Sequence, residues 1–397
     1  MKRVAIFGAG AIVLASLAVL VAWATSPDPG FNPATFEAEP LVASVAGLDE
    51  ATTLAQFAHK DGTVRTILVL GFTDETVTGI DLVALGGTVS DNPFAALASA
   101  TDLPRSKKEA QALPQVNIPI DQLLATGSSG ARHIGTGTNF PEHAQEASSG
   151  SVFQFPKFGS ATPARTTVKH RPGILLDYEV ELCMRFDRDI ASLEDFDAAT
   201  KGVFLCGDFT NRNALVELAD ADNLDSGSGF SDAKSGPDFF PTGPFLVIPK
   251  DREAFIRKVR MTTSLNGEAR QDARGSEMTL SFRELVAKAL DDMSQPRFLF
   301  NGGREFLAEP AHIGREMTIM SGTAEGVIFT SPTRADIIEA FVDYTFAGGP
   351  AASQGFMDIA KARFIANENA TGHFLQPKDT VRHSSSSLGT IEVTVIE

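Results

Sequence analysis

The segment from Leu175 to Met184 constrains the fold more than any other part of the sequence, because its polar and apolar side chains alternate. Successive side chains of a β-strand point to opposite faces, so this pattern predicts a strand with one acidic and one apolar face. The acidic face has Asp177, Glu179, Glu181 and Cys183, and the apolar face has Tyr178, Val180, Leu182 and Met184. Three carboxylates in a row repel one another unless water or a cation relieves them. The strand is therefore either a solvated face or one wall of a cation site.

A second segment, residues 202–208, favours the cation site. If it forms the neighbouring antiparallel strand, Cys206 and Asp208 share one of its faces. A register that places Asp208 opposite Glu181 clusters the carboxylates, and it also places Cys206 opposite Cys183. Carboxylate oxygens are hard ligands that suit Mg²⁺, Mn²⁺ or Ca²⁺ rather than zinc. The two cysteines, the only ones in the chain, allow one disulfide in an oxidising compartment.

Short β-prone runs predict further strands along much of the chain. They lie at residues 54–58, 63–70, 76–82, 245–248 and 390–396. Apolar periodicity predicts helices at residues 93–113, where Pro104 interrupts the pattern, and at residues 333–346 and 354–367. The predicted fold class is therefore α+β, with β-structure dominant.

Changes in composition divide the chain into four parts. Residues 1–24 are mostly apolar, and residues 25–47 have the composition of a linker. Residues 48–125 predict a small β-rich N-terminal module. Residues 126–397 form the larger domain, which carries both acidic strands and has a helical insertion at about residues 331–373.

The first 24 residues predict where the protein is located. Lys2 and Arg3 precede an uncharged run from Val4 to Ala24, and the small residues that end this run are typical of a secretory signal. The run is also close to the ~20 residues that span a bilayer, so an uncleaved membrane anchor is the alternative. Either interpretation predicts an exported protein, periplasmic or anchored with its body outside the cytoplasm, and membrane contact only if the segment is retained.

The charge balance argues against one class of partner. The chain has 50 acidic and 34 basic residues, which gives a formal net charge of −16. Neutralising a phosphate backbone takes a basic patch, and the sequence has no basic cluster of that kind. A nucleic-acid partner is therefore not expected, whereas one cationic or metal-lined cleft for an anionic substrate remains compatible with the composition.

Six motifs follow one another along the larger domain. They are Gly137-Thr-Asn-Phe-Pro-Glu-His-Ala-Gln-Glu146, Asp177-Tyr-Glu-Val-Glu-Leu182, Cys206-Gly-Asp208, Lys234-Ser-Gly-Pro-Asp-Phe-Phe-Pro-Thr-Gly-Pro244, Asn266-Gly-Glu-Ala-Arg-Gln271 and Gly322-Thr-Ala-Glu-Gly-Val327. In this order they resemble the motifs of the fumarylacetoacetate hydrolase family, from about Ile118 to the C-terminus. The resemblance implies the mixed β-roll of that family as the catalytic domain, with the small β-rich module before it.

The resemblance also implies a metal site. Matched residue by residue, Glu179, Glu181 and Asp208 correspond to the family's metal ligands. The implied cofactor is Mg²⁺, with Mn²⁺ or Ca²⁺ as alternatives, which agrees with the oxygen ligands that the two strands provide.

Four more residues correspond to catalytic or substrate-binding groups. His143 and Glu146 match a dyad that activates water or moves a proton, and Lys234 and Thr323 match groups that meet substrate oxygens near the metal. Taken alone, these residues have simpler interpretations: a pair on a surface helix, a solvated lysine and an ordinary turn residue.

The implied activity is hydrolysis of a carbon–carbon bond in a small 1,3-dicarbonyl or acylpyruvate-type 2-oxo acid. The cation would stabilise enolate charge, while the dyad activates water. Decarboxylation, tautomerisation or hydration of a 2-oxo acid at the same site is the alternative reaction, and a non-catalytic exported binding protein is the alternative class. A small anionic oxo acid is the expected partner and a homodimer the expected assembly. Departures from the family pattern at Phe140, Gly207 and Ala324 leave the proposed ligands in place and bear on substrate choice.

Overall fold

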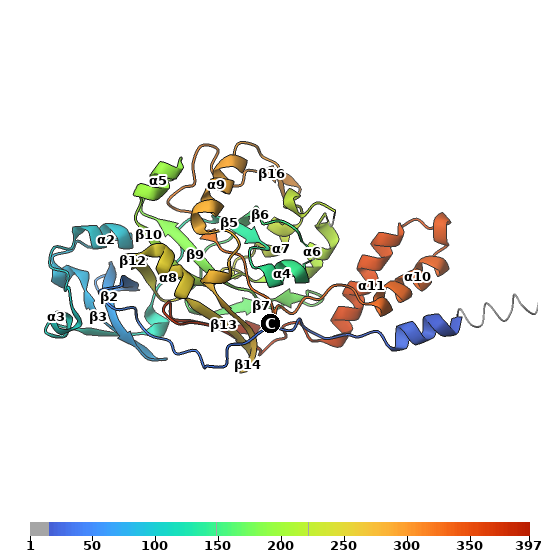
Figure 1. Ribbon diagram of the computed structural model, residues 1–397, viewed down its shortest axis with the longest axis horizontal. Helices are drawn as coiled ribbons and strands as arrows, with labels where there is room; N and C mark the ends of the chain where they lie inside the picture. Colours follow the sequence, from blue (N-terminus) through green and yellow to red (C-terminus); the bar gives the residue numbers. More distant parts are fainter. Residues whose placement is uncertain (1–15, 148, 221) are drawn as a thin grey trace, which may run out of the picture.

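The computed structural model describes residues 16–397, apart from residues 148 and 221. A β-rich body occupies the centre of the molecule, and the strands and helices of residues 51–119 lie at one end of it (Figure 1). Two helices, formed by residues 334–371, project from the opposite end beside a helix of residues 16–24.

The largest sheet contains both the N-terminal strands and strands of the central body. In spatial order it consists of β4 (Val116–Pro119), β3 (Thr76–Asp81), β2 (Val64–Phe72), β1 (Ala51–Ala58), β12 (Leu246–Pro249), β10 (Lys201–Gly207), β9 (Val180–Phe186), β17 (Ile319–Met320), β5 (Arg132–Gly137) and β6 (Phe153–Phe158). Antiparallel pairing of β1 with β12 joins the N-terminal strands to the body. The three strands expected between residues 54 and 82 are confirmed, and the boundary between the N-terminal module and the catalytic domain stays a prediction.

A second large sheet lies in the same body. It consists of β14 (Glu268–Arg274), β13 (Arg260–Leu265), β18 (Thr380–Ser385), β19 (Thr390–Ile396) and β7 (Arg165–Lys169). Two short pairs complete the β-structure, β8 (Leu176–Asp177) with β11 (Thr210–Asn211), and β15 (Phe298–Phe300) with β16 (Gly303–Glu305). Both large sheets contribute to one apolar core, in which Leu182 of β9 and Val393 of β19 are fully buried. The β-dominated α+β class is therefore confirmed.

The α-helices are mostly short and connect the strands. They are α2 (Pro93–Ser99), α3 (Lys107–Gln111), α4 (Pro141–Glu146), α5 (Leu193–Ala198), α6 (Arg212–Leu218), α7 (Phe230–Lys234), α8 (Arg252–Lys258), α9 (Phe282–Asp292), α10 (Arg334–Phe346) and α11 (Phe356–Thr371). The helix expected at residues 93–113 is divided, because α2 ends at Ser99 and α3 starts anew at the N-cap Ser106. Pro104 lies in the gap, where it disfavours helical geometry for the residue before it.

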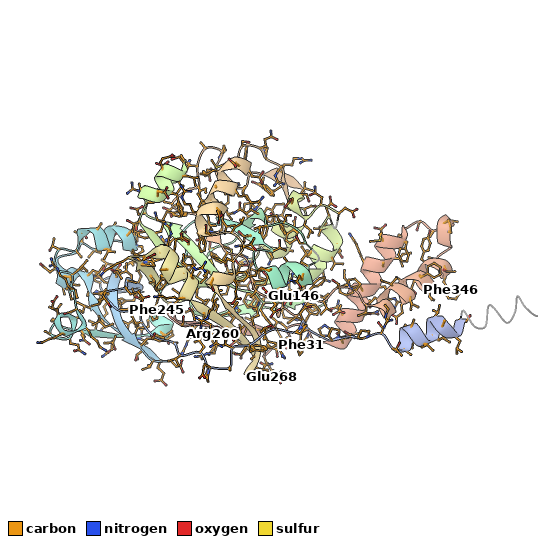
Figure 2. The ribbon with its side chains drawn as sticks, viewed as in Figure 1. Phe31, Glu146, Phe245, Arg260, Glu268 and Phe346 are labelled. Carbon is orange, nitrogen blue, oxygen red and sulfur yellow. A yellow bond between two sulfur atoms is a disulfide. The ribbon has the colours of Figure 1, made fainter. Side chains whose placement is uncertain are left out.

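The two helices expected after residue 330 are confirmed as α10 and α11. Thr333 caps α10, since its side chain accepts a hydrogen bond from the amide of Asp336. The helices pack against each other and project from the body (Figure 1). Phe346, labelled on this projection in Figure 2, is 88% exposed.

The chain before β1 follows the surface of the body (Figure 1). Asn32 donates from its amide to the carbonyl of Val327 at 3.2 Å, and Ser44 to that of Ser386 at 3.0 Å. Residues 16–24 are helical, whereas the first fifteen residues of the expected signal or anchor lie outside the described part. Across residues 16–397, leaving aside 148 and 221, no helix has the length and apolar character needed to cross a membrane.

The acidic segment departs from the expected single strand. It forms β8 and β9, with a break at Tyr178 and Glu179. The carboxylate of Asp177 accepts hydrogen bonds from the amides of Tyr178, Ile328 and Phe329, and β8 pairs with β11 rather than with β10. Asp177 therefore fixes the course of the backbone at the break and lies outside the cluster of Glu179, Glu181 and Asp208.

The expected register between the two acidic strands was wrong by two residues. Cys206 lies opposite Glu181, and the amide of Asp208 donates to the carbonyl of Glu179 at 2.9 Å. Because side chains alternate with a period of two, this shift keeps every side chain on its expected face, so the acids still cluster. Cys183 and Cys206 remain neighbours, as expected, and form a disulfide with a Cα–Cα distance of 5.9 Å.

Candidate metal centre and active site

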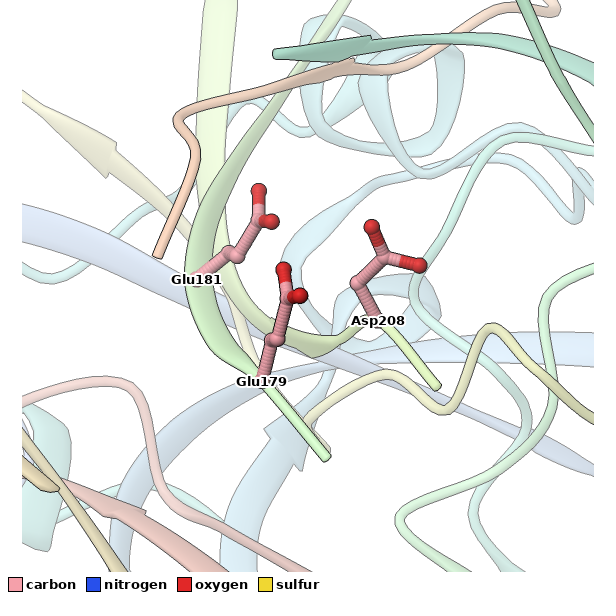
Figure 3. A group of neighbouring side chains, drawn as sticks. All are labelled: Glu179, Glu181 and Asp208. Atoms are coloured by element: carbon pink, nitrogen blue, oxygen red, sulfur yellow. The ribbon is translucent and has the colours of Figure 1, made fainter. Parts of the chain in front are cut away.

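Three buried carboxylates form the centre of the candidate site. Glu179 immediately precedes β9, Glu181 lies within β9, and Asp208 follows the last residue of β10. One oxygen from each lies within 4.8 Å of the others, and all three residues are buried. Figure 3 shows their carboxylates directed to the same side. The strand pairing thus assembles three hard oxygen donors from two separate segments.

Two buried lysines contact these acids. Lys234 Nζ lies 2.7 Å from Glu179 Oε2 and 2.9 Å from Asp208 Oδ2, and it donates to Thr210 Oγ1 at 2.9 Å. Lys157, from β6, lies 2.7 Å from the other Asp208 oxygen and also donates to main-chain carbonyls. Lys234 was expected near the site, whereas Lys157 was missed. Its only signal in the sequence is a lysine among the phenylalanines of β6, Phe153–Phe158.

Arg212, at the start of α6, joins the site to Asp177. Its Nη2 lies 2.9 Å from Glu179 Oε1, and its Nε lies 2.8 Å from Asp177 Oδ2. Sequence analysis did not assign Arg212 a role. Through Arg212, Asp177 joins the three clustered acids in one network of ion pairs. With all four acids ionised, this network has four negative charges against the three positive charges of Lys157, Lys234 and Arg212.

Among the described residues, Glu181 is the acid of this network that forms no ion pair with a base. One of its oxygens accepts from the amide of Gly322 at 2.8 Å, whereas Oε1 is buried without a hydrogen-bond partner among the residues that the structure describes. Burial raises the pKa of Glu181 well above its usual value, and the nearby Asp208 and Glu179 raise it further. Burial acts in the same direction on Glu179, but Lys234 and Arg212 outweigh it and lower the pKa of that carboxyl.

A divalent cation fits this donor set. Carboxylate oxygens are the ligands that Mg²⁺, Mn²⁺ and Ca²⁺ prefer. A cation would give Glu181 Oε1 the partner that it lacks and would offset the excess negative charge. Glu179, Glu181 and Asp208 are thus the residues that would hold the ion.

His143 and Glu146 form the expected pair on α4. His143 Nδ1 lies 2.7 Å from Glu146 Oε2, and the other Glu146 oxygen accepts from the amide of Gly326 at 2.9 Å. Glu146 lies in the central body (Figure 2), and each side chain is 13% exposed. Because Nδ1 is bonded to the carboxylate, the imidazole would contact a ligand through Nε2. In the tautomer with the hydrogen on Nδ1, Nε2 can accept a proton.

Thr323 lies beside the site, and its hydroxyl is engaged with protein groups. It donates to the carbonyl of Val180 at 2.9 Å and accepts from Gln271 Nε2 at 3.0 Å. These bonds connect the loop of residues 322–327 to β9, next to the amide of Gly322 that contacts Glu181. The expected contact of Thr323 with a substrate stays a prediction.

Comparisons with known proteins agree with this fold. The family model described as fumarylacetoacetate (FAA) hydrolase C-terminal matches residues 132–396. Among solved structures, 2-hydroxyhepta-2,4-diene-1,7-dioate isomerase from Mycobacterium marinum aligns with a TM-score of 0.52 and 16% sequence identity, over 87% of this chain and 98% of that chain. Cg1458, solved with an inhibitor, aligns with a TM-score of 0.52 and 14% identity, over 87% of this chain and 99% of that chain.

The family match covers well over half of the chain, and it includes all seven candidate site residues. At 14% and 16% identity, the structural neighbours show a shared fold. No curated protein sequence matches the chain significantly. The family match and the shared fold lead to one conclusion: the chain belongs to the fumarylacetoacetate hydrolase family.

Proposed function

We propose that this protein is a divalent-metal-dependent hydrolase that cleaves a carbon–carbon bond in an acylpyruvate-type 2-oxo acid or a related 1,3-dicarbonyl acid. The observation that carries the proposal is the buried group of Glu179, Glu181 and Asp208, in which one Glu181 oxygen has no hydrogen-bond partner within the described part of the chain. A histidine–carboxylate pair, His143 and Glu146, lines a pocket together with Arg212, which lies 2.9 Å from Glu179.

The proposed cofactor is Mg²⁺, or else Mn²⁺ or Ca²⁺, held by these three carboxylates. When bound, it would polarise the oxygens of the oxo acid and stabilise the negative charge that develops on them. Lys234 adds a fixed positive charge 2.7 Å from Glu179, next to the position at which the acid group of the substrate would lie. Thr323 would orient the substrate from the neighbouring loop.

His143 and Glu146 supply the proton transfers in this proposal. Nε2 of His143 takes a proton from water, and Glu146 stabilises the resulting imidazolium through Nδ1. The water oxygen bonds to the acyl carbon, and the bond from that carbon to the adjacent methylene breaks. The methylene then takes up a proton from the imidazolium, so the products are a carboxylic acid and pyruvate.

Isomerisation is the second candidate, because a structural relative from Mycobacterium marinum is named as an isomerase of a dioate, a compound with two carboxylates. The same base could move a proton between carbon and oxygen without adding water. Decarboxylation and hydration of a 2-oxo acid are further alternatives, and a non-catalytic binding protein is the alternative outside enzymes.

A substrate screen with matched variants tests the proposal. The protein is assayed with acylpyruvates, oxaloacetate and 2-oxo-enoic acids in the presence of Mg²⁺ or Mn²⁺. Glu181→Gln should lose both turnover and metal binding, whereas His143→Ala should lose turnover and still bind metal. Glu268→Gln is the control, because Glu268 is an exposed surface residue whose side chain is 72% accessible. Unchanged activity in Glu181→Gln would contradict the metal assignment, and unchanged activity in His143→Ala would contradict the dyad.

We also propose that residues 1–24 export the protein and that it forms a homodimer. The basic start and apolar run support export. Cell fractionation of the full chain tests it, and recovery of the protein in the cytoplasm would contradict it. Light scattering after size-exclusion chromatography tests the homodimer, and a mass no greater than the 42.2 kDa of one full chain would contradict that proposal.

A further inference from the structure

A pocket of about 310 Å³ extends from the dyad and has a mainly apolar lining. His143 and Glu146 lie on its wall together with residues from α6, α7 and α11 and from the loop before α10. The principal apolar side chains of the lining are Leu215, Val216, Leu224, Phe230 and Phe329. Several of them are only half-buried, so they keep surface available for contact with a ligand.

Arg212 lies between the pocket and the carboxylate group of Glu179, Glu181 and Asp208. Arg212 lines the pocket, and its Nη2 lies 2.9 Å from Glu179. Its guanidinium carbon also lies 5.3 Å from the centroid of the Phe329 ring. Because His143 and Glu146 lie on the pocket wall, an oxo acid whose acyl carbon lies at His143 would place its tail beside Phe329 in the apolar pocket.

Arg212 and Lys361 of this lining already make hydrogen bonds within the described residues. Arg212 pairs with Asp177 and Glu179, and Lys361 donates to the carbonyl of Glu217 at 2.9 Å. A carboxylate at the far end of a substrate would lose its hydration here and would have to compete for these groups. An alkyl or aromatic group would instead gain the free energy of apolar burial.

We propose, on the basis of the hydrolase function above, that this pocket binds an apolar acyl group. The preferred substrates are therefore 2-oxo acids with an alkyl or aromatic tail, and Leu215, Leu224 and Phe329 are specificity-determining residues. An acyl group that ends in a second carboxylate is disfavoured.

A homologous series of substrates measures this preference. Acetyl-, propanoyl-, butanoyl- and pentanoylpyruvate are compared with succinylpyruvate, whose acyl group is similar in size to pentanoyl but ends in a carboxylate. We expect kcat/KM to rise roughly fourfold for each added methylene until the pocket is filled. A flat series, or faster turnover of succinylpyruvate than of pentanoylpyruvate, would overturn the inference.

Variants of the pocket wall provide the matched test. Leu215→Arg places a cation in the pocket, so it should flatten the alkyl series and raise kcat/KM for succinylpyruvate. Leu218→Arg is the control, because Leu218 lies on the same helix, is 48% exposed and is not among the lining residues. If thermal unfolding shows that Leu215→Arg does not fold, Leu224→Lys makes the same test from another part of the wall. Equal effects of the wall and control variants would contradict the assignment.

Binding measured without turnover separates this inference from the proposed hydrolysis. Calorimetric titrations compare 2-oxohexanoate with 2-oxoadipate in the presence of Mg²⁺. Tighter binding of 2-oxohexanoate supports the apolar pocket even if no acylpyruvate is cleaved, an outcome that would contradict only the hydrolase proposal. Tighter binding of 2-oxoadipate would overturn the pocket assignment whatever the reaction.

Discussion

A buried neutral histidine in β5 makes the folded protein sensitive to acid. His133 is fully buried, and Thr318 donates its amide hydrogen to Nδ1 at 3.2 Å. Because an amide can only donate, Nδ1 must be the unprotonated nitrogen, and Nε2 donates to the carbonyl of Gly159 at 3.0 Å. Burial lowers the pKa of His133 to about 3, and Lys157 and Arg185 act in the same direction.

The size of the effect follows from linkage between protonation and folding. An unfolded histidine has a pKa of about 6.5, so between pH 7 and pH 5 the unfolded chain takes up about 0.7 of a proton here, while the folded chain takes up almost none. The free energy of unfolding should therefore fall by about 2 kcal/mol over this interval because of His133. The stabilisation is fully present above the unfolded pKa and is lost progressively as the pH falls towards the folded pKa of about 3.

Denaturant unfolding at several pH values measures this effect. His133→Gln retains a donor for Gly159 and removes the titration, so its free energy of unfolding should fall less steeply between pH 7 and pH 5, by about 2 kcal/mol. His383 provides a second test, since it is fully buried and burial lowers its pKa to about 3. The wild type and His133→Gln are compared in metal-free buffer, so that metal binding does not contribute to the free energy of unfolding. Parallel pH curves for the wild type and His133→Gln would refute this reasoning.

Three further predictions concern the site and its supporting structure. Mg²⁺ at 100 times its Kd should raise the free energy of unfolding by about 2.7 kcal/mol, and Glu181→Gln should abolish this rise, as thermal unfolding with and without Mg²⁺ would show. Replacing both Cys183 and Cys206 with Ala should lower the free energy of unfolding by roughly 3 kcal/mol, because the disulfide closes a loop between residues that are 23 apart. Urea titrations that coincide with those of the wild type would contradict this prediction. Lys157→Met removes one partner of a buried ion pair and should cost roughly 3–5 kcal/mol in the same urea assay. Lys258→Met, the control at a surface pair, should cost no more than about 1 kcal/mol, and equal losses would count against the burial argument.

Local patterns determined much of the candidate site. Because strand side chains alternate with a period of two, the acidic segment was predicted to place Glu179 and Glu181 on one face. A register shift of two residues leaves each side chain on the same face. The cluster was therefore predicted correctly although the register was wrong. Helix α10 was predicted for a similar reason, because the apolar periodicity of residues 333–346 is a local signal.

The tertiary structure alone decided which charges surround the carboxylates. Lys157 reaches Asp208 from 51 residues away, and Arg212 joins two acids that the sequence pattern had placed together on one strand face. Strand periodicity describes which way a side chain points, but it contains no information about which distant strand lies beside it. The sequence by itself thus determined the family motifs, the acidic face and the likeness to a metal site. The roles of Asp177, which fixes the backbone at the strand break, and of Glu181, which has an unpartnered oxygen within the described residues, could not be predicted from the sequence. Both depend on contacts between segments that are far apart in the chain.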